Sequence, residues 1–90
     1  MKTALITGAT SGIGAACAHL FAAQGYNLIL VTRREQLLLE NAKHLEDKYA
    51  IETKRIVADV RDFENLSYVL ETLPAQWKKV DVLINNAGLS

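Results

Sequence analysis

Hydrophobic residues along the chain gather in short apolar runs, separated by longer segments of mixed character. The runs at residues 2–7, 27–32, 53–58 and 80–84 predict β-strands. They are continuous rather than alternating with polar residues, which is typical of strands covered on both faces of a sheet. The third run is less apolar than the others, and we expect it at an edge of the sheet.

Apolar residues recur at helical spacing between these runs, which predicts helices at 12–24 and 35–49 and a third that Asp62 caps. Pro74 either ends this third helix or starts a short new turn. Gly25 is expected to close the first helix. The residues expected to face the sheet are Ile13, Ala16, Cys17, Leu20 and Phe21 in the first helix, Leu38, Ala42, Leu45 and Tyr49 in the second, and Leu66, Val69, Leu70 and Leu73 in the third. We expect His19 and His44 in solvent, and Trp77 in the core or at an interface.

This order of elements, β-α-β-α-β-α-β, predicts an α/β fold with helices on both faces of a parallel sheet, because crossovers between parallel strands are right-handed. A doubly wound, Rossmann-type sheet of this kind usually has the strand order 3-2-1-4. Its ligand lies beyond the carboxyl ends of strands 1 and 4. The loops after the first and fourth strands should therefore lie side by side.

The turn after the first strand has the sequence Thr7-Gly8-Ala9-Thr10-Ser11-Gly12-Ile13-Gly14. A strand that leads into a glycine-rich turn and then a helix is a nucleotide-binding geometry. The glycines let the main chain approach a pyrophosphate, and free N–H groups at the helix start attract its negative charge. The glycine spacing differs from the commoner Gly-x-Gly-x-x-Gly, and the alternative is a loop that only needs flexibility.

Composition narrows the range of functions. Half of the 90 residues are hydrophobic, and ten basic residues balance ten acidic ones, so nothing suggests a nucleic-acid partner or an anionic membrane surface. The apolar runs are too short to span a membrane, and no group of Cys and His residues suggests a metal site. The single cysteine, Cys17, suits a reducing compartment. Without a visible signal peptide, the expected location is the cytoplasm.

The glycine turn resembles the cofactor turn Thr-Gly-x-x-x-Gly-Ile-Gly of the short-chain dehydrogenase/reductase family. A second stretch, Asn85-Asn86-Ala87-Gly88, matches that family's Asn-Asn-Ala-Gly signature. The resemblance covers residues 1–90 and implies the N-terminal part of a dinucleotide-binding domain, ending before the catalytic segment. Segments 73–77 and 80–89 are similar to the NADP-dependent serine and 3-hydroxy-acid dehydrogenases of the family. The residues implied to form the cofactor turn are Gly8, Ala9, Thr10, Ser11, Gly12, Ile13 and Gly14.

The type of cofactor should be decided at the end of the second strand, where an acidic side chain would bind the adenosine ribose and select NAD. This chain has Thr32-Arg33-Arg34 there. Two guanidinium groups can hold the additional 2′-phosphate of NADP through charge-assisted, often bidentate hydrogen bonds. We therefore predict NADP binding at Arg33 and Arg34. The alternative is that both are ordinary surface charges at a helix start.

The resemblance implies further cofactor contacts at the ends of the third and fourth strands. Asp59 matches an acid that contacts the adenine ring, with the backbone of Val60 beside it; the alternative is that Asp59 is a simple turn residue. Asn86 matches a residue beside the ribose and nicotinamide half of the cofactor, and Asn85 is expected to tie the strand end to its neighbours. Both amides are expected to make backbone hydrogen bonds, because they would be partly buried.

The family's chemistry needs a serine and a Tyr-x-x-x-Lys pair, in which the lysine lowers the pKa of the tyrosine acid/base. Leu30, Thr53 and Thr72 stand four residues after the three tyrosines, so we expect the chain to be inactive alone.

Two hypotheses of function follow. One is the NADP-binding portion of an oxidoreductase that moves hydride between NADP(H) and an alcohol or carbonyl substrate, such as a 3-hydroxy acid or serine, in a homo-oligomer. The alternative is a non-catalytic nucleotide-binding or interaction module. Because the fourth strand would be an open apolar edge, we expect the 90-residue chain to be marginally stable or to self-associate.

Overall fold

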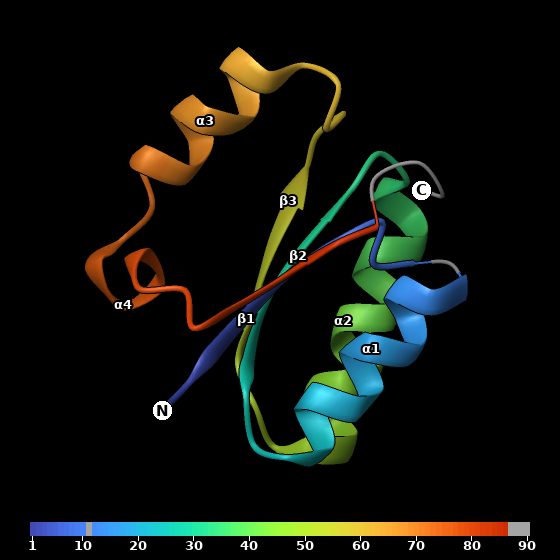
Figure 1. Cartoon of the computed structure of the whole chain (residues 1–90). Helices are drawn as coiled ribbons and strands as arrows, with labels where there is room; N and C mark the ends of the chain where they lie inside the picture. Colours follow the sequence, from blue (N-terminus) through green and yellow to red (C-terminus); the bar gives the residue numbers. More distant parts are fainter. Residues whose placement is uncertain (11, 87–90) are drawn as a thin grey trace.

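The computed structural model describes residues 1–10 and 12–86, and within them the strands and helices follow the expected order, with one additional short helix before the last strand (Figure 1). The elements are β1 (Thr3–Thr7), α1 (Gly12–Ala23), β2 (Asn27–Thr32), α2 (Glu35–Tyr49), β3 (Thr53–Val57), α3 (Phe63–Glu71), a short α4 (Ala75–Lys78) and β4 (Val82–Asn85). The strands pair in parallel in the order β3-β2-β1-β4. The α/β class, the strand order and the edge position of β3 are confirmed.

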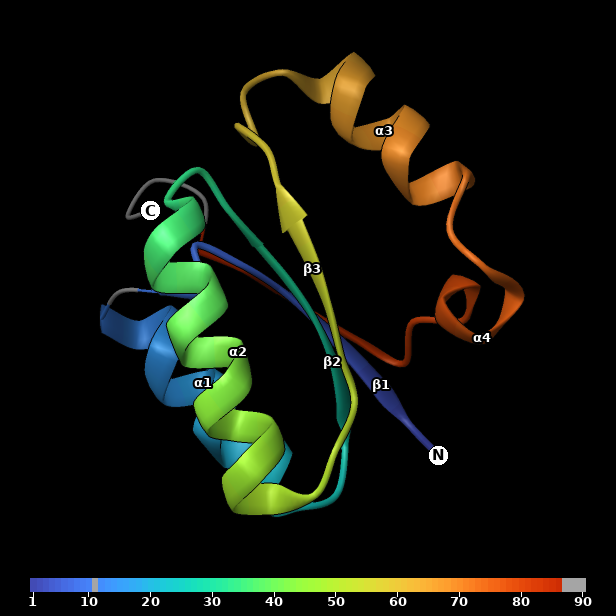
Figure 2. The same ribbon diagram turned by 180° about the vertical axis from the view of Figure 1, so that it is seen from behind.

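The parallel register brings the carboxyl ends of all the described strands to one edge of the sheet. Thr7 pairs with Val31 of β2 on one side and with Asn85 of β4 on the other, and Thr32 pairs with Val57 of β3. Helices α1 and α2 lie on one face of the sheet, and α3 and α4 lie on the other (Figures 1 and 2). The chain's N-terminus lies at the opposite edge, so the loops that follow the strands meet away from it.

Helix α1 faces the sheet with a different stripe from the one predicted. Gly14, Ala18 and Ala22 are its buried residues, whereas Ile13 and Leu20 are 64% and 57% exposed. The prediction that these two residues face the sheet is wrong, and so is the same prediction for Ala16, which is exposed. For Cys17 and Phe21 it is confirmed, because both are half-buried against the core. The reason is contact distance: a Cβ at position 14 would overlap the carbonyl oxygen of Gly8.

The other helices bury the faces that their sequences predict. Leu38, Ala42 and Leu45 of α2 join the core on the α1 side. On the opposite face, Leu73 and Trp77 are buried, and half-buried residues of α3, namely Leu66, Val69 and Leu70, pack against them. Within residues 1–10 and 12–86, no helix has the length and apolar character needed to cross a bilayer.

Local signals for the helix ends are also confirmed. The Asp62 carboxylate accepts a hydrogen bond from the N–H of Asn65 at 3.3 Å, which caps α3. Gly25 adopts a φ of 85° after α1, and its N–H bonds to the carbonyl of Ala22 at 3.0 Å. A positive φ of this size favours glycine, which explains why a glycine follows α1 at position 25.

His19 does not lie in solvent as predicted. Its side chain is half-buried between α1 and α2, with Nδ1 3.2 Å from the hydroxyl oxygen of Tyr49. Its ring also meets the ring of His44 edge-to-face, at 5.6 Å between centroids. Burial lowers the pKa of His19, and the positive charge of Lys48 and the neighbouring His44 act in the same direction. His44 itself is exposed, as expected.

Candidate functional site

The glycine turn leaves the carboxyl end of β1 and enters α1. Gly8 and Gly12 have φ values of 62° and 50°, in the region that side chains disfavour. An ideal Cβ on Gly12 would meet no atom of the described residues within 4 Å, and Gly12 is exposed. The first N–H groups of α1 have no partner inside the helix. At Gly12 the turn thus presents an open stretch of main chain, while Ser11, predicted as part of the site, lies outside the described residues.

The end of β4 lies against this turn. The Asn86 side-chain amide donates a hydrogen bond to the carbonyl oxygen of Gly8 at 3.3 Å, and the Asn86 backbone N–H donates to the Thr7 hydroxyl at 2.9 Å. The predicted meeting of the first and fourth loops is therefore confirmed, as is the backbone bond of the Asn86 amide. Ala87 and Gly88 of the predicted signature lie outside the described residues.

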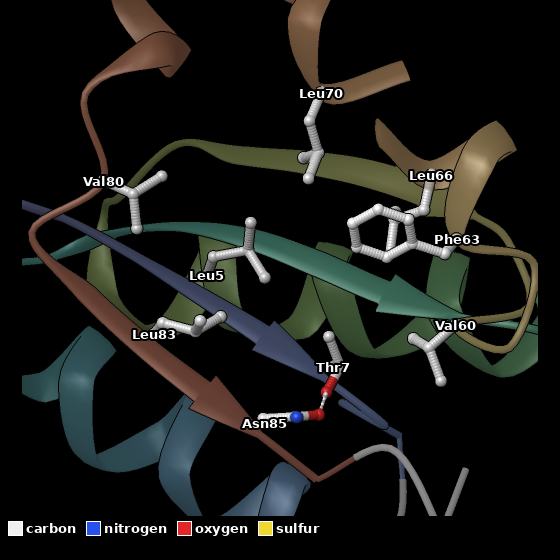
Figure 3. Close-up of a pocket in the computed structure, with 9 residues that line it drawn as sticks. All are labelled: Leu5, Thr7, Val60, Phe63, Leu66, Leu70, Val80, Leu83 and Asn85. Carbon is white, nitrogen blue, oxygen red and sulfur yellow. Dashed lines mark hydrogen bonds between the residues drawn. The ribbon is translucent and has the colours of Figure 1, made fainter. Parts of the chain in front are cut away.

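Asn85 differs in part from its prediction. It ties β4 to β1, as expected, but its side-chain oxygen accepts from the Thr7 hydroxyl at 3.1 Å rather than from a backbone group (Figure 3). The residue is exposed rather than partly buried. A backbone partner was predicted because burial was assumed, and an exposed amide does not need one.

The end of β2 contacts the other side of the glycine turn. The Thr32 and Thr10 hydroxyl oxygens are 3.2 Å apart, and the Ala9 N–H donates to the carbonyl of Val31 at 3.4 Å. Arg33 and Arg34 follow Thr32 directly and are both exposed. The two guanidinium groups therefore extend from a loop that is bonded to the glycine turn.

The end of β3 carries Asp59 beside these arginines. Arg61 donates to the Asp59 carboxylate from its backbone N–H at 2.9 Å and from its guanidinium at 2.8 Å. These hydrogen bonds lower the pKa of Asp59 to about 2, and the charge of Arg33 acts in the same direction. Asp59 fulfils a local turn role through the Arg61 N–H, and it also places an ionised carboxylate at this edge of the sheet.

Val60 has its side chain on the face of the sheet that α3 and α4 cover. There it lines an apolar hollow of about 410 Å³ between α3 and the strands β1 and β4 (Figure 3). The residues that line this hollow are Leu5, Thr7, Val60, Phe63, Leu66, Leu70, Val80, Leu83 and Asn85. None of these side chains is charged, so the hollow is unsuited to a phosphate.

The structure thus brings most of the predicted site residues to one edge of the sheet. These are Gly8, Ala9, Thr10, Gly12, Ile13, Gly14, Arg33, Arg34, Asp59 and Asn86. The sequence placed Thr7 in the glycine turn and Thr32 directly before the arginines, but no role was predicted for either hydroxyl, and Arg61 was not predicted at this edge. A signal existed for the threonines, since each is the polar last residue of a strand that is otherwise largely aliphatic.

Comparison with known proteins gives matches over nearly the whole chain. Residues 2–90 match the family model described as short chain dehydrogenase. A sulfoacetaldehyde reductase of Chromohalobacter salexigens is 46% identical over 86 residues, covering 96% of this chain and 33% of the relative. An NADP-dependent 3-hydroxy acid dehydrogenase of Schizosaccharomyces pombe is 46% identical over 90 residues, covering 99% of this chain and 35% of the relative.

A solved structure agrees with these sequence matches. The crystal structure of L-sorbose reductase from Gluconobacter frateurii, complexed with NADPH and L-sorbose, has a TM-score of 0.88 and 38% sequence identity, covering 97% of this chain and 33% of that protein. The chain therefore spans about a third of the length of the relatives described here.

Proposed function

The chain belongs to the short-chain dehydrogenase family, and from this premise we propose that it is the NADP-binding portion of an oxidoreductase. The complete protein would transfer hydride between NADP(H) and an alcohol or carbonyl compound. The observation that carries the proposal is the meeting of an open glycine turn with the loop of Arg33 and Arg34, joined through the Thr10–Thr32 contact of 3.2 Å.

The glycine turn fits the pyrophosphate of a dinucleotide. Gly12 combines a positive φ with open space where a Cβ would stand, so a ligand can approach the main chain closely. The first turn of α1 contains no acidic residue that would repel a phosphate. Free N–H groups and the positive end of the helix dipole supply the attraction.

The arginine loop fits the 2′-phosphate that distinguishes NADP from NAD. Residues 31–34 contain no carboxylate to bind the ribose hydroxyls, and both arginines are exposed beside the turn. Guanidinium groups match phosphate oxygens with paired hydrogen bonds. The Schizosaccharomyces pombe relative is described as NADP-dependent and the sorbose reductase was solved with NADPH, which supports the same cofactor here.

Within this proposal the residues of the chain bind and orient the cofactor. NADPH supplies the hydride from its nicotinamide ring. Asn86, held against the Gly8 carbonyl, would position the ribose and nicotinamide half, and Asp59 with the backbone of Val60 would contact the adenine. Ser11, in the same turn, would complete the phosphate contacts. The Tyr-x-x-x-Lys pair of the reaction would come from a segment beyond residues 1–90.

For the complete protein we also propose a substrate class, an oligomeric state and a location in the cell. The name of the Schizosaccharomyces pombe relative favours a 3-hydroxy acid as the substrate, and serine, which carries a hydroxyl at the same carbon, belongs to this chemical class. We also propose a homo-oligomer, which light scattering of the complete protein would test. A cytoplasmic location agrees with the free thiol of Cys17.

The experiment that tests the proposal removes both guanidinium groups. We expect Arg33→Ala/Arg34→Ala to weaken NADPH binding about 100-fold, because two charge-assisted hydrogen bonds are lost, and to change NADH binding little. Fluorescence titration of both cofactors, on the complete protein, measures this. The control is Lys43→Ala/Arg55→Ala, which removes two exposed charges elsewhere. Equal losses for NADPH and NADH would refute recognition of the 2′-phosphate.

A further inference from the structure

Thr32 combines deep burial with contacts to both predicted binding elements. Its side chain is 1% exposed, and its hydroxyl oxygen lies 3.2 Å from the hydroxyl of Thr10 in the glycine turn. The same oxygen accepts the backbone N–H of Arg34, also at 3.2 Å. One hydroxyl therefore bonds the turn on one side and the arginine loop on the other.

We propose that Thr32 is a positioning residue for the cofactor, which sets the spacing between the glycine turn and the Arg33–Arg34 loop. The inference rests on the proposed function and deepens it. A dinucleotide with a 2′-phosphate must meet both elements at once, so its binding depends on their relative placement. NADH lacks that phosphate and gains less from a correctly placed arginine loop.

The chemistry of a hydroxyl suits this role. A threonine hydroxyl has one proton and two acceptor sites, so it can accept the Arg34 N–H and still bond Thr10. Burial keeps the Thr32 hydroxyl away from any ligand, so its effect passes through its two partners. Without the Thr32 hydroxyl, the backbone N–H of Arg34 would lose the acceptor that it has at 3.2 Å, which is unfavourable, and Arg34 is the second of the proposed phosphate ligands.

The test compares two substitutions at position 32 in the complete protein. Thr32→Val keeps the shape and removes the hydroxyl, and we expect it to weaken NADPH binding about tenfold and NADH binding by less than about threefold. Thr32→Ser keeps the hydroxyl and should restore the wild-type ratio of the two affinities. Thr3→Val is the matched control, because Thr3 is also buried, at 4% exposed, but lies at the far end of β1.

A double-mutant cycle identifies the bond responsible. Thr10→Val removes the same contact from the turn side, so its effect and that of Thr32→Val on NADPH binding should be less than additive. If Thr32→Val does not fold, Thr10→Val must still lower the ratio of NADPH to NADH affinity. Additive effects would mean that the Thr10–Thr32 bond does not link the two elements, and would overturn the inference.

The outcomes separate this inference from the proposed function. A wild-type protein without preference for NADPH overturns both. A wild-type preference that survives Thr32→Val overturns only the positioning role. A Thr32→Val protein that loses affinity for both cofactors equally would assign Thr32 a structural role alone, and that result also overturns the inference.

Discussion

The two faces of the sheet are packed in different ways. On the face of α1 and α2, the helix residues Ala18, Ala22 and Ala42 are no more than 2% exposed, and they let the helices lie close to β1 and β2. On the face of α3 and α4, no residue of α3, all of which the structure describes, is fully buried. There Phe63 and Leu83 are 74% and 63% exposed beside the hollow of about 410 Å³.

This difference explains where the candidate site lies. Phosphate recognition by main-chain N–H groups requires a backbone held in one place, and close packing of small residues supplies that. The glycine turn belongs to the tightly packed face, through the contact of Gly14 with the Gly8 carbonyl. The looser face carries the apolar hollow, which the strand ends Thr7 and Asn85 border.

The largest effect is expected from Gly14→Val on the tight face. The new side chain would overlap the Gly8 carbonyl and reach the Asn86 amide, so we expect the free energy of unfolding to fall by about 3 kcal/mol and dinucleotide binding to be lost. Chemical denaturation and cofactor titration measure the two effects. Ala16→Val is the control, since Ala16 is exposed on the same helix. Unchanged affinity in the Gly14 variant would contradict close packing at the turn.

Two substitutions that enlarge a side chain, one on each face of the sheet, compare how tightly the two faces are packed. Ala18→Leu adds volume beneath α1, where Ala18 is 2% exposed, and should cost about 2 kcal/mol of stability. Leu70→Phe adds volume beside the hollow that Leu70 lines, and should cost less than about 1 kcal/mol or stabilise the fold. Urea denaturation of both variants checks the contrast. Equal costs would show that the two faces are packed alike.

The exposed apolar edge of the loose face should promote self-association of the 90-residue chain. Leu83→Ser on β4 should weaken that association about tenfold, since a leucine buried in an interface contributes a few kcal/mol at most. The melting temperature should hardly change, because Leu83 is 63% exposed. Sedimentation velocity measures the association. The matched control is Leu39→Ser on α2, at 42% exposed, and an equal effect there would mean that association is not confined to the loose face.

The smallest effect concerns pH and the contact between α1 and α2. Burial lowers the pKa of His19 below 6.5, and Lys48 and His44 of α2 add to the shift. The fold therefore favours the neutral ring, which can accept the Tyr49 hydroxyl proton. The stability that the neutral His19 ring contributes is complete above pH 6.5, the ordinary pKa of histidine. This contribution is lost as the pH falls from 6.5 through the lower pKa that His19 has in the folded state.

Unfolding measured across pH 5 to 8 in wild type and His19→Gln checks this expectation. The wild-type protein should lose more stability on acidification than the variant. His44→Gln is the comparison, because His44 is exposed and its replacement should change the pH dependence less. Parallel curves for wild type and His19→Gln would exclude His19 as the titrating group.

Much of the fold follows from local sequence. The predicted bounds of β2 and α2 coincide with those observed, because an aliphatic run and an amphipathic repeat each act over neighbouring residues. The order of the elements and the strand order usual for it were enough to place the first and fourth loops together, since parallel strands bring their carboxyl ends to one edge. The site's location was therefore predictable before any side chain was placed.

The rotation of α1 was not predictable in this way. Ile13 and Leu20 are more hydrophobic than Gly14 and Ala18, so apolar periodicity alone favours burying the larger residues. The structure buries the smaller ones, because the helix must approach the Gly8 carbonyl closely enough to continue the turn. Residue size at a contact outweighed hydrophobic area here, and that contact exists only after the turn has folded back.

The sequence alone determined the elements, their order and the residue types of the site, because these depend on neighbours along the chain. Only the tertiary structure decided the partners of its polar groups. Thr7 and Asn85 are 78 positions apart, Thr10 and Thr32 are 22 apart, and His19 and Tyr49 are 30 apart. A hydroxyl or imidazole has no preference for a partner until packing excludes water and brings one within hydrogen-bond distance.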